Sequence, residues 1–358
     1  MKIISMLPVL AFGDAVGNDT LAVHNSLKKA GYESVIVAAV IDKRLDANVA
    51  MSADDLSWIT ADDIVIYHLS TGHELNYRFA ALPCRKIIKY HNITPPEYFF
   101  GYNQNTMTSC MEGYRAASKY VNQAEYCWVD SAYNGEELKQ MGYTCPIDVI
   151  PILIPFDDYA KKPDKQILER MKDDYVNIIF TGRIAPNKRQ EDVIAAFYQY
   201  KKYYNQKSRL ILVGNHAGME VYYESLKKYV ELLELDDVIF TGHISFEEIL
   251  AYYCSADIFL CMSDHEGFCV PLVESMYFDV PVLAKGTSAI TETLGGSGMI
   301  LPDNDPMVAA SAINRILTDP QLKSAIVANQ RERLKDFEHD KIENLLLEKI
   351  QKYIAEEY

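Results

Sequence analysis

The chain has 358 residues, of which 49% are hydrophobic and 24% are charged, an ordinary globular balance in a chain too long for one typical core. Two domains are therefore expected. The formal net charge of −15 argues against a protein that wraps nucleic acid along an extended surface, since such binding needs many Lys and Arg contacts with phosphates.

The first predicted element is a strand rather than a signal peptide. Residues 1–8 are apolar, but they lack a small-residue cleavage site and run directly into Phe12, Gly13 and Asp14. No apolar run approaches the length that a transmembrane helix needs. The seven cysteines are odd in number and scattered, with no Cys-x-x-Cys pair. This usage predicts a cytoplasmic protein in a reducing environment, without a structural zinc site.

Short β-rich apolar runs alternate with helical segments along the chain, which is typical of parallel sheets covered on both faces. In the first half we expect a helix from near Asp19 to Gly31, a long helix over 105–123 and a third over 134–141. The expected strands of this half are Lys2–Met6, Ser34–Val40, Asp63–Tyr67, Lys86–Tyr90, Tyr126–Val129 and Asp148–Ile150.

A domain joint is expected between Pro151 and Pro163, where prolines and acids interrupt the alternation. The chain is thus predicted to divide into an amino-terminal domain, residues 1–155, and a carboxy-terminal domain, residues 156–339. The elements expected in the second domain are strands at 177–181, 209–213, 238–241, 257–262, 280–284 and 299–301, and helices near 188–204, 218–235, 245–254 and 270–278.

The chain is expected to be helical beyond Pro306, with a break at Asp319-Pro320 and a final helix within 340–358. This last helix carries an apolar stripe that must be buried. Sequence spacing leaves open whether it packs on its own domain or crosses back to the amino-terminal one. The stripe consists of Ile342, Leu345, Leu346, Ile350 and Ile354.

The most informative stretch runs from Glu266 to Glu274. It follows the predicted strand 257–262, so Glu266 should lie beyond the carboxyl end of that strand, where open α/β sheets bind ligands. Glu274 should lie near the first turn of the next helix. The N–H groups of residues 267–269 would point at a bound anion, and the two carboxylates could accept hydrogen bonds from sugar hydroxyls. Glu266 alone would more often be a structural group such as a helix cap, but the spacing with Glu274 favours ligand binding.

Two cations, Arg183 and Lys188, follow the first strand of the second half and precede a helix. A planar guanidinium and a mobile ammonium at such a position suit a diphosphate, although an isolated pair could also be solvated surface. The loop lacks the Gly-Lys-[Ser/Thr] ending of a Walker motif, and no Gly-x-Gly-x-x-Gly follows a strand. The sequence therefore lacks the main motifs that would indicate a kinase or a dinucleotide-binding enzyme.

These residues match a known family. Arg183-x4-Lys188, the turn at residues 242–245 and the Glu266-x7-Glu274 run, in this order, resemble the family-4 glycosyltransferases of group 1 type. The resemblance covers nearly the whole chain and is most specific between residues 178 and 296. It implies an α/β GT-B fold, in which two Rossmann-like, doubly wound parallel-sheet domains face a cleft.

The resemblance also implies roles for residues of the second half. Arg183 and Lys188 would bind the donor diphosphate, Glu266 the donor sugar, and Glu274 the ribose hydroxyls. Cys269 stands where many family members have glycine, which puts close packing against the sugar in doubt. The further donor-binding positions would be Gly182, His243, Ile244, Gly267, Phe268 and Cys269, with His243 and Ile244 bordering the base.

In the first half, residues 13–19 look like the glycine-containing loop of the family, which would close over the donor phosphates. Gly17 and Asn18 would lie on the donor side. Tyr90-His91-Asn92 looks like the strand-end histidine of the family, which would contact the transferred sugar, although a lone histidine is as often a satisfied structural residue. Asp14, Asp19 and Ser131 are candidates for the acceptor side, and both aspartates could instead be loop or helix-cap groups.

The predicted function is that of a retaining glycosyltransferase. The enzyme would move a hexose from a nucleotide-diphosphate sugar to a hydroxyl of a saccharide or polyprenyl-linked acceptor, in polysaccharide or glycoconjugate biosynthesis. No cofactor, metal or nucleic-acid partner is expected, and peripheral contact with the inner face of a membrane is compatible with the family. The alternatives are another GT-B enzyme, either a sugar-nucleotide epimerase or a phosphorylase, and a non-catalytic nucleotide-sugar-binding protein.

Overall fold

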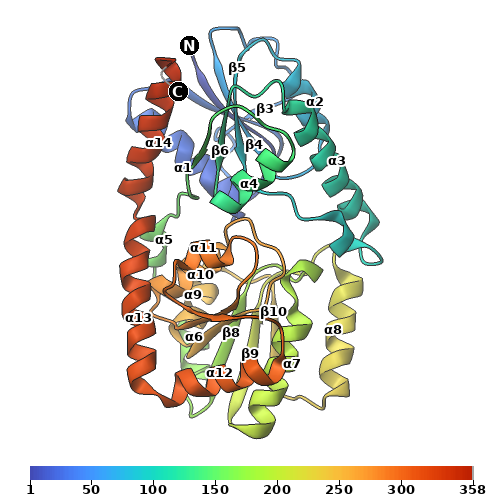
Figure 1. Ribbon diagram of the computed structural model, residues 1–358, viewed down its shortest axis with the longest axis vertical. Helices are drawn as coiled ribbons and strands as arrows, with labels where there is room; N and C mark the ends of the chain where they lie inside the picture. Colours follow the sequence, from blue (N-terminus) through green and yellow to red (C-terminus); the bar gives the residue numbers. More distant parts are fainter. Residues whose placement is uncertain (357–358) are drawn as a thin grey trace. The chain divides into compact units, whose positions relative to one another are not determined.

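Each half of the chain folds around a parallel β-sheet, as the alternating apolar runs predict (Figure 1). The structure is a computed structural model that describes residues 1–356. The amino-terminal unit contains residues 1–97, 105–156 and the chain from Phe337 onward, and the carboxy-terminal unit contains residues 98–104 and 157–336. The short segment Tyr98–Gln104, expected in the first domain, thus belongs by its contacts to the second unit.

The amino-terminal sheet has seven parallel strands in the order β3-β2-β1-β4-β5-β6-β7. Its chain order reverses between β1 and β4, and such a switch point is where doubly wound sheets bind ligands. The two-residue edge strand β3 was not predicted, because it is too short to show a pattern. The strands are β1 Ile3–Leu10, β2 Ser34–Ile41, β3 Met51–Ser52, β4 Ile64–Leu69, β5 Arg85–Tyr90, β6 Tyr126–Val129 and β7 Ile147–Val149.

The first helix begins earlier than expected. Helix α1 spans Ala15–Lys29, and Asp14 rather than Asp19 precedes it, with the Asp14 carboxylate accepting a hydrogen bond of 3.2 Å from the Gly17 N–H. A Cβ atom on Gly17 would lie 2.6 Å from the Ala11 carbonyl oxygen, so glycine allows α1 to approach the end of β1. The next helices are α2 Glu74–Ala80, α3 Gln104–Tyr120 and α4 Ala132–Gln140. A 3-10 turn, Pro96–Phe99, precedes α3.

The final helix α14, His339–Ile354, crosses back to the amino-terminal unit, where it lies beside α1 (Figure 1). Its apolar stripe is buried against the sheet, and the Arg85 guanidinium donates a hydrogen bond of 2.6 Å to the Tyr353 carbonyl. The shared buried cluster includes Ile3, Leu27, Ile64, Trp128, Leu153, Ile342, Leu346, Ile350 and Tyr353. Burial of this stripe therefore ties the end of the chain to its beginning.

The carboxy-terminal sheet has six parallel strands in the order β10-β9-β8-β11-β12-β13, so its switch point lies between β8 and β11. Its strands are β8 Val176–Thr181, β9 Ser208–Val213, β10 Val238–Gly242, β11 Ile258–Cys261, β12 Val282–Lys285 and β13 Met299–Leu301. Its helices are α5 Phe156–Tyr159, α6 Lys165–Arg170, α7 Gln190–Tyr203, α8 Glu220–Leu232, α9 Phe246–Cys254, α10 Val270–Tyr277, α11 Ile290–Leu294, α12 Pro306–Thr318 and α13 Pro320–Leu334.

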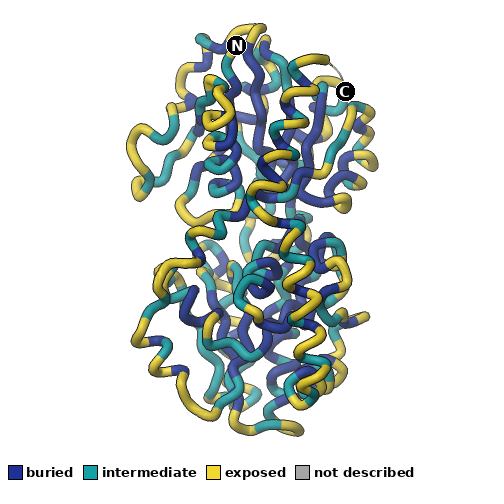
Figure 2. The backbone as a smooth tube through the Cα atoms, turned by 90° about the vertical axis from the view of Figure 1, so that its left-hand side faces the viewer, coloured by how far each residue is buried: buried dark blue, intermediate teal, exposed yellow. Residues whose placement is uncertain are grey.

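Asp319 marks the predicted break between two helices, since it ends α12 and its carboxylate caps the N-terminus of α13. In both units the central strands are buried, as Figure 2 shows, which explains why they read as nearly continuous apolar runs. Within residues 1–356, no helix combines the length and the apolar character that crossing a bilayer requires.

Candidate functional site

Lys188 and Glu266 meet at the switch point of the carboxy-terminal sheet. Lys188 ends a 3-10 turn in the loop after β8, and Glu266 lies in the loop after β11. The Lys188 Nζ atom lies 2.5 Å from Glu266 Oε2, and the two side chains are 23% and 8% exposed. Burial lowers the pKa of Lys188, but the negative charge and the hydrogen bond of the Glu266 carboxylate act in the opposite direction, and the net shift is upward. The ammonium group therefore stays charged in a half-buried position.

The backbones of the same two loops are joined by hydrogen bonds. The Asn187 side-chain amide donates to the His265 carbonyl over 3.1 Å, and the Asp264 N–H donates to the Asn187 carbonyl over 2.9 Å. The Lys285 ammonium lies 2.6 Å from the Asp264 carboxylate. The first two contacts hold the β8 and β11 loops together, and the third ties the β11 loop to the end of β12.

The other predicted donor residues of the β8 and β10 loops are more exposed. Arg183 is exposed, while its carbonyl accepts a hydrogen bond of 3.1 Å from the Gln190 side chain, and Gly182 joins it to β8 with φ near +148°. His243 is exposed and Ile244 is partly buried. The turn that contains these two residues ends in a capping box at the start of α9, Ser245 with Glu248.

The loop between Glu266 and α10 has an unusual backbone at Cys269. This residue is the N-cap of α10 and has φ near +72°, in the left-handed region that favours glycine. A non-glycine residue there costs on the order of 1 kcal/mol. Gly267 is partly exposed, and Phe268 is buried with its carbonyl accepting a hydrogen bond of 2.6 Å from the Thr293 hydroxyl. Helix α10 therefore starts from a strained, well-anchored turn.

Glu274 lies one turn further into α10 than expected and already has two protein partners. The Tyr159 hydroxyl donates to its Oε1 atom over 3.0 Å, and the Tyr253 hydroxyl donates to its Oε2 atom over 2.6 Å. Burial raises the pKa of Glu274, and the two tyrosine hydrogen bonds offset only part of this rise. Because a carboxylate has about four acceptor positions, about two remain for a ligand.

Sequence reasoning missed both tyrosines. They belong to helices α5 and α9, and the chain contains 25 tyrosines without any local signal that marks these two. Only the fold brings their hydroxyls to Glu274.

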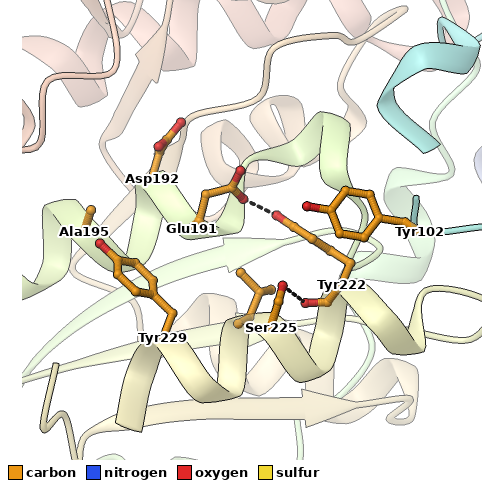
Figure 3. Close-up of a pocket in the computed structure, with 8 residues that line it drawn as sticks. Tyr102, Glu191, Asp192, Ala195, Tyr222, Ser225 and Tyr229 are labelled. Carbon is orange, nitrogen blue, oxygen red and sulfur yellow. Dashed lines mark hydrogen bonds between the residues drawn. The ribbon is translucent and has the colours of Figure 1, made fainter. Parts of the chain in front are cut away.

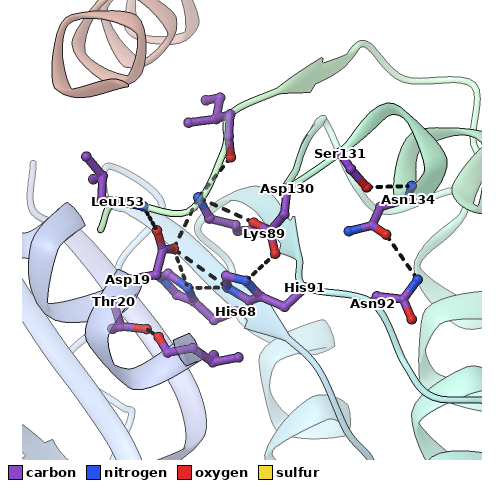
Figure 4. A network of polar contacts seen from close by, with 12 residues as sticks. Asp19, Thr20, His68, Lys89, His91, Asn92, Asp130, Ser131, Asn134 and Leu153 are labelled. Atoms are coloured by element: carbon purple, nitrogen blue, oxygen red, sulfur yellow. Dashed lines mark hydrogen bonds and ion pairs between the residues drawn. The ribbon is translucent and has the colours of Figure 1, made fainter. Parts of the chain in front are cut away.

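In the amino-terminal unit, His91 lies in a buried polar network at the carboxyl ends of β4, β5 and β6 (Figure 4). His91 Nδ1 lies 2.8 Å from Asp130 Oδ2, and His91 Nε2 lies 2.9 Å from His68 Nδ1. Since a carboxylate only accepts, His91 Nδ1 carries the proton of the first contact. Both ring nitrogens thus have protein partners, and the His91 side chain is 1% exposed. Its predicted contact with a donor sugar stays a prediction.

Lys89 and Asp19 complete this network. The Lys89 ammonium lies 3.1 Å from Asp19 Oδ2 and 3.8 Å from Asp130 Oδ1, and all three side chains are buried (Figure 4). The Leu153 N–H donates to Asp19 Oδ1 over 2.9 Å. The carboxylates of Asp19 and Asp130 thus share the single ammonium group of Lys89. The pKa of His68 lies well below its usual value, mainly because the ring is buried and to a lesser extent because His91 and Lys89 are close to it.

The structure corrects the predicted placement of Asp19, Gly17 and Asn18, and it shows Asp14 and Ser131 as helix N-caps. Asp19 lies inside α1 with its carboxylate buried against Lys89, instead of starting the helix. Gly17 is buried and Asn18 partly buried in the first turns of α1, instead of in a loop. Asp14 is an exposed N-cap. Ser131 is a buried N-cap of α4, whose hydroxyl accepts a hydrogen bond of 3.3 Å from the Asn134 N–H.

A separate hollow of about 290 Å³ lies between α7 and α8 (Figure 3). The Tyr222 hydroxyl donates to the Glu191 carboxylate inside it, and burial raises the pKa of Glu191. None of the predicted site residues lines this hollow. The lining consists of Tyr102, Glu191, Asp192, Ala195, Tyr222, Ser225, Leu226 and Tyr229.

Sequence comparison points to one family for the carboxy-terminal unit. Residues 161–333 match the family described as "Glycosyl transferases group 1". A D-inositol 3-phosphate glycosyltransferase of Kineococcus radiotolerans is 25% identical over 175 residues, which cover 45% of this chain and 40% of the relative. A GDP-mannose-dependent alpha-(1-6)-phosphatidylinositol monomannoside mannosyltransferase of Mycolicibacterium smegmatis is 25% identical over 200 residues, 52% of this chain and 50% of the relative. The chain spans about half the length of the curated relatives it matches.

Structural comparison covers nearly the whole chain. Anabaena Alr3699/HepE, solved in complex with UDP-glucose, is similar with a TM-score of 0.76 and 17% sequence identity, over 98% of this chain and 100% of that one. This likeness, together with the two doubly wound sheets, confirms the predicted GT-B fold.

Proposed function

We propose that this protein is a retaining glycosyltransferase, since residues 161–333 match the family described as "Glycosyl transferases group 1". It moves a hexose from a nucleotide-diphosphate sugar to a hydroxyl group of a saccharide or lipid-linked acceptor. The observation that carries this proposal is the pairing of Lys188 with Glu266 at the switch point of the carboxy-terminal sheet. A cation for the diphosphate and a carboxylate for the sugar then stand side by side.

In this proposal Lys188 and Arg183 hold the donor diphosphate. Lys188 is partly exposed and its present partner is a single carboxylate, so it can turn toward phosphates that carry more negative charge. Arg183 is exposed in the same loop and adds a planar pair of donors. Glu266, once released from Lys188, accepts hydrogen bonds from the hydroxyls of the sugar.

Transfer with retention needs no protein nucleophile. The bond between the anomeric carbon and the phosphate oxygen breaks, and the acceptor oxygen forms a bond to the same face of that carbon. The proton of the acceptor hydroxyl passes to the departing phosphate. Arg183 and Lys188 stabilise the charge that develops on this phosphate, and positioning supplies much of the remaining rate. The proposed reaction uses no metal ion and no cofactor.

Glu274 holds the ribose in the same proposal. Its carboxylate is oriented by Tyr159 and Tyr253, and its two remaining acceptor positions suit the vicinal hydroxyls of a ribose. The donor class is a nucleotide sugar, in line with the UDP-glucose complex of HepE and the GDP-mannose dependence of the mycobacterial relative. The acceptor belongs to polysaccharide or glycoconjugate synthesis, as the names of the relatives suggest.

A donor panel tests the proposal. The full chain is mixed with UDP- and GDP-hexoses, and thermal stabilisation and slow donor hydrolysis are measured. We expect one donor to raise the unfolding temperature and to release nucleoside diphosphate faster with an added sugar acceptor. EDTA should not lower this release, and NMR of the product should show the anomeric configuration of the donor.

The alternatives give different results. A sugar-nucleotide epimerase would change the donor without any acceptor, and a phosphorylase would require inorganic phosphate. A non-catalytic binding protein would be stabilised by the donor and yet neither transfer nor hydrolyse it. An inverted product would contradict the retaining mechanism.

A further inference from the structure

Two cysteines and a carboxylate converge next to the ion pair in the carboxy-terminal unit. Cys261 ends β11, and Cys269 is the N-cap of α10. The two sulfur atoms and a carboxylate oxygen of Glu266 all lie within 4.8 Å of one another. Cys261 is fully buried, and Cys269 and Glu266 are each more than nine-tenths buried.

We propose that Cys261, Cys269 and Glu266 form a binding site for a thiophilic divalent cation such as Zn²⁺. Zinc takes thiolate and carboxylate ligands at about 2.0–2.3 Å, so its tetrahedral ligands lie about 3.3–3.8 Å apart. The three atoms are therefore close enough to bind one ion after small side-chain movements. A fourth position remains for water or for an added ligand.

Charge balance makes this buried site suitable for a dication. The two thiols release two protons when they bind zinc. One Zn²⁺ thus takes the place of two H⁺, and the total charge of the cluster does not change. The cluster is neutral before the exchange, because Lys188 compensates Glu266, and it is neutral afterwards for the same reason. Burial of an uncompensated charge, which would oppose binding, is thus avoided.

The backbone of Cys269 supports the same conclusion. Glycine would adopt its left-handed conformation without strain, yet this chain places a thiol there, next to a second thiol. The two cysteines come from the end of a strand and the start of a helix. They lie eight positions apart in the sequence, which is not the spacing of a zinc motif, and for this reason the sequence alone predicts no structural zinc site.

The consequence for activity rests on the proposed function. Glu266 and the turn at Cys269 belong to the proposed donor-sugar side of the site. A bound cation engages the Glu266 carboxylate and fixes this turn, so it competes with the donor. Zinc therefore acts as an inhibitor and not as a cofactor.

The test measures metal binding without any donor. The reduced, metal-free full chain is titrated with Zn²⁺ against a chromophoric chelator, and with Co²⁺ to observe thiolate-to-metal absorption. We expect one tight equivalent, with release of about two protons seen as a buffer-dependent enthalpy. Cys261→Ala and Cys269→Gly should each weaken Zn²⁺ binding at least about tenfold. Cys254→Ser is the matched control, because Cys254 is exposed elsewhere, and should bind as the parent does.

The outcomes separate the two proposals. Absence of the thiolate absorption, or equal Zn²⁺ affinity in both variants and the parent, would overturn the site, and neither result bears on glycosyl transfer. Rapid disulfide formation between Cys261 and Cys269 with peroxide, without zinc binding, would also overturn it in favour of a redox pair. If zinc binds and donor affinity does not fall, the site stands and the inhibition is wrong. If zinc inhibits glycosyl transfer by the parent but not by Cys261→Ala, the result would support both the zinc site and its competition with the donor.

Discussion

Tyr253 donates a hydrogen bond of 2.6 Å to the partly buried carboxylate of Glu274, and this contact joins α9 to α10 in the carboxy-terminal unit. The contact orients the carboxylate that we assign to the ribose. Because burial raises the pKa of Glu274, the tyrosine hydroxyls also help to keep this group ionised.

Glu274→Ala should weaken the binding of nucleoside diphosphate itself by at least about tenfold, equal to about 1.4 kcal/mol. The ribose loses its acceptor, and two buried tyrosine hydroxyls lose theirs. Tyr253→Phe should weaken binding less, since it leaves the carboxylate in place. Calorimetry with the diphosphate measures both. Glu231→Ala on the exposed face of α8 serves as the control, and equal affinity in Glu274→Ala and this control would argue against the ribose role.

Arg183→Ala and Lys188→Ala should each lower turnover by about 100-fold, because each removes a cation from the departing phosphate. Initial rates of nucleotide release, with thermal unfolding as the check on folding, measure the effect. Lys188→Ala should also lower the unfolding temperature, since it leaves Glu266 without its ion-pair partner. Arg183 is exposed, so Arg183→Ala should lower the unfolding temperature less than Lys188→Ala does.

Lys202→Ala is the matched control for these variants, as Lys202 is an exposed lysine on α7. Its turnover should equal that of the parent. Near-normal turnover in both Arg183→Ala and Lys188→Ala would leave the proposed phosphate contacts without support.

The amino-terminal unit should lose stability in mild acid because of His68. Its pKa is depressed in the fold and returns to 6.5 when the chain unfolds, so the unfolded state binds more protons below pH 6.5. The contribution of neutral His68 is thus fully present above pH 6.5 and falls as the pH drops toward the depressed value. The slope is at most about 1.4 kcal/mol per pH unit for this group.

Chemical unfolding of the parent and of His68→Asn between pH 7.5 and pH 5 tests this dependence. The groups that face His68 are Asp19, Lys89 and His91, and they are common to both proteins. The stability difference between parent and variant should therefore shrink as the pH falls. A difference that stays constant across this range would contradict a neutral buried His68.

Gly17→Ala should lower the free energy of unfolding by about 1–3 kcal/mol, because the new methyl group would overlap the Ala11 carbonyl oxygen and push α1 from the end of β1. Gly135 in α4 offers a matched control. A Cβ atom there meets its nearest neighbours at 3.6 Å, so Gly135→Ala should be neutral or stabilising. Urea unfolding measures the stability of both variants. If Gly17→Ala were as stable as Gly135→Ala, α1 would tolerate the added methyl group and the prediction would be wrong.

The sequence by itself determined the order of strands and helices and the loops that carry the candidate chemistry. Apolar periodicity placed Tyr126–Val129 and Met299–Leu301 with the bounds that the structure has. Because parallel strands present their carboxyl ends at one edge, the sequence alone assigns Lys188 and Glu266 to loops at the same edge of one sheet. These signals are local, since they depend on residues a few positions apart.

Contacts between distant segments could not be predicted in this way. The sequence offers both Asp14 and Asp19 as caps of α1. In the structure Asp14 caps the helix, because Asp19 lies inside it and pairs with the buried Lys89. The two tyrosines on Glu274 come from separate helices.

The return of α14 to the amino-terminal unit and the meeting of Cys261 with Cys269 belong to the same class of contact. An apolar stripe shows that a helix must be buried but not against which partner, and a cysteine shows a thiol but not its neighbour. The sequence therefore determined which chemical groups lie at each strand end. Only tertiary packing, which minimises exposed apolar surface and unpaired buried charge over the whole chain, decided which of these groups touch.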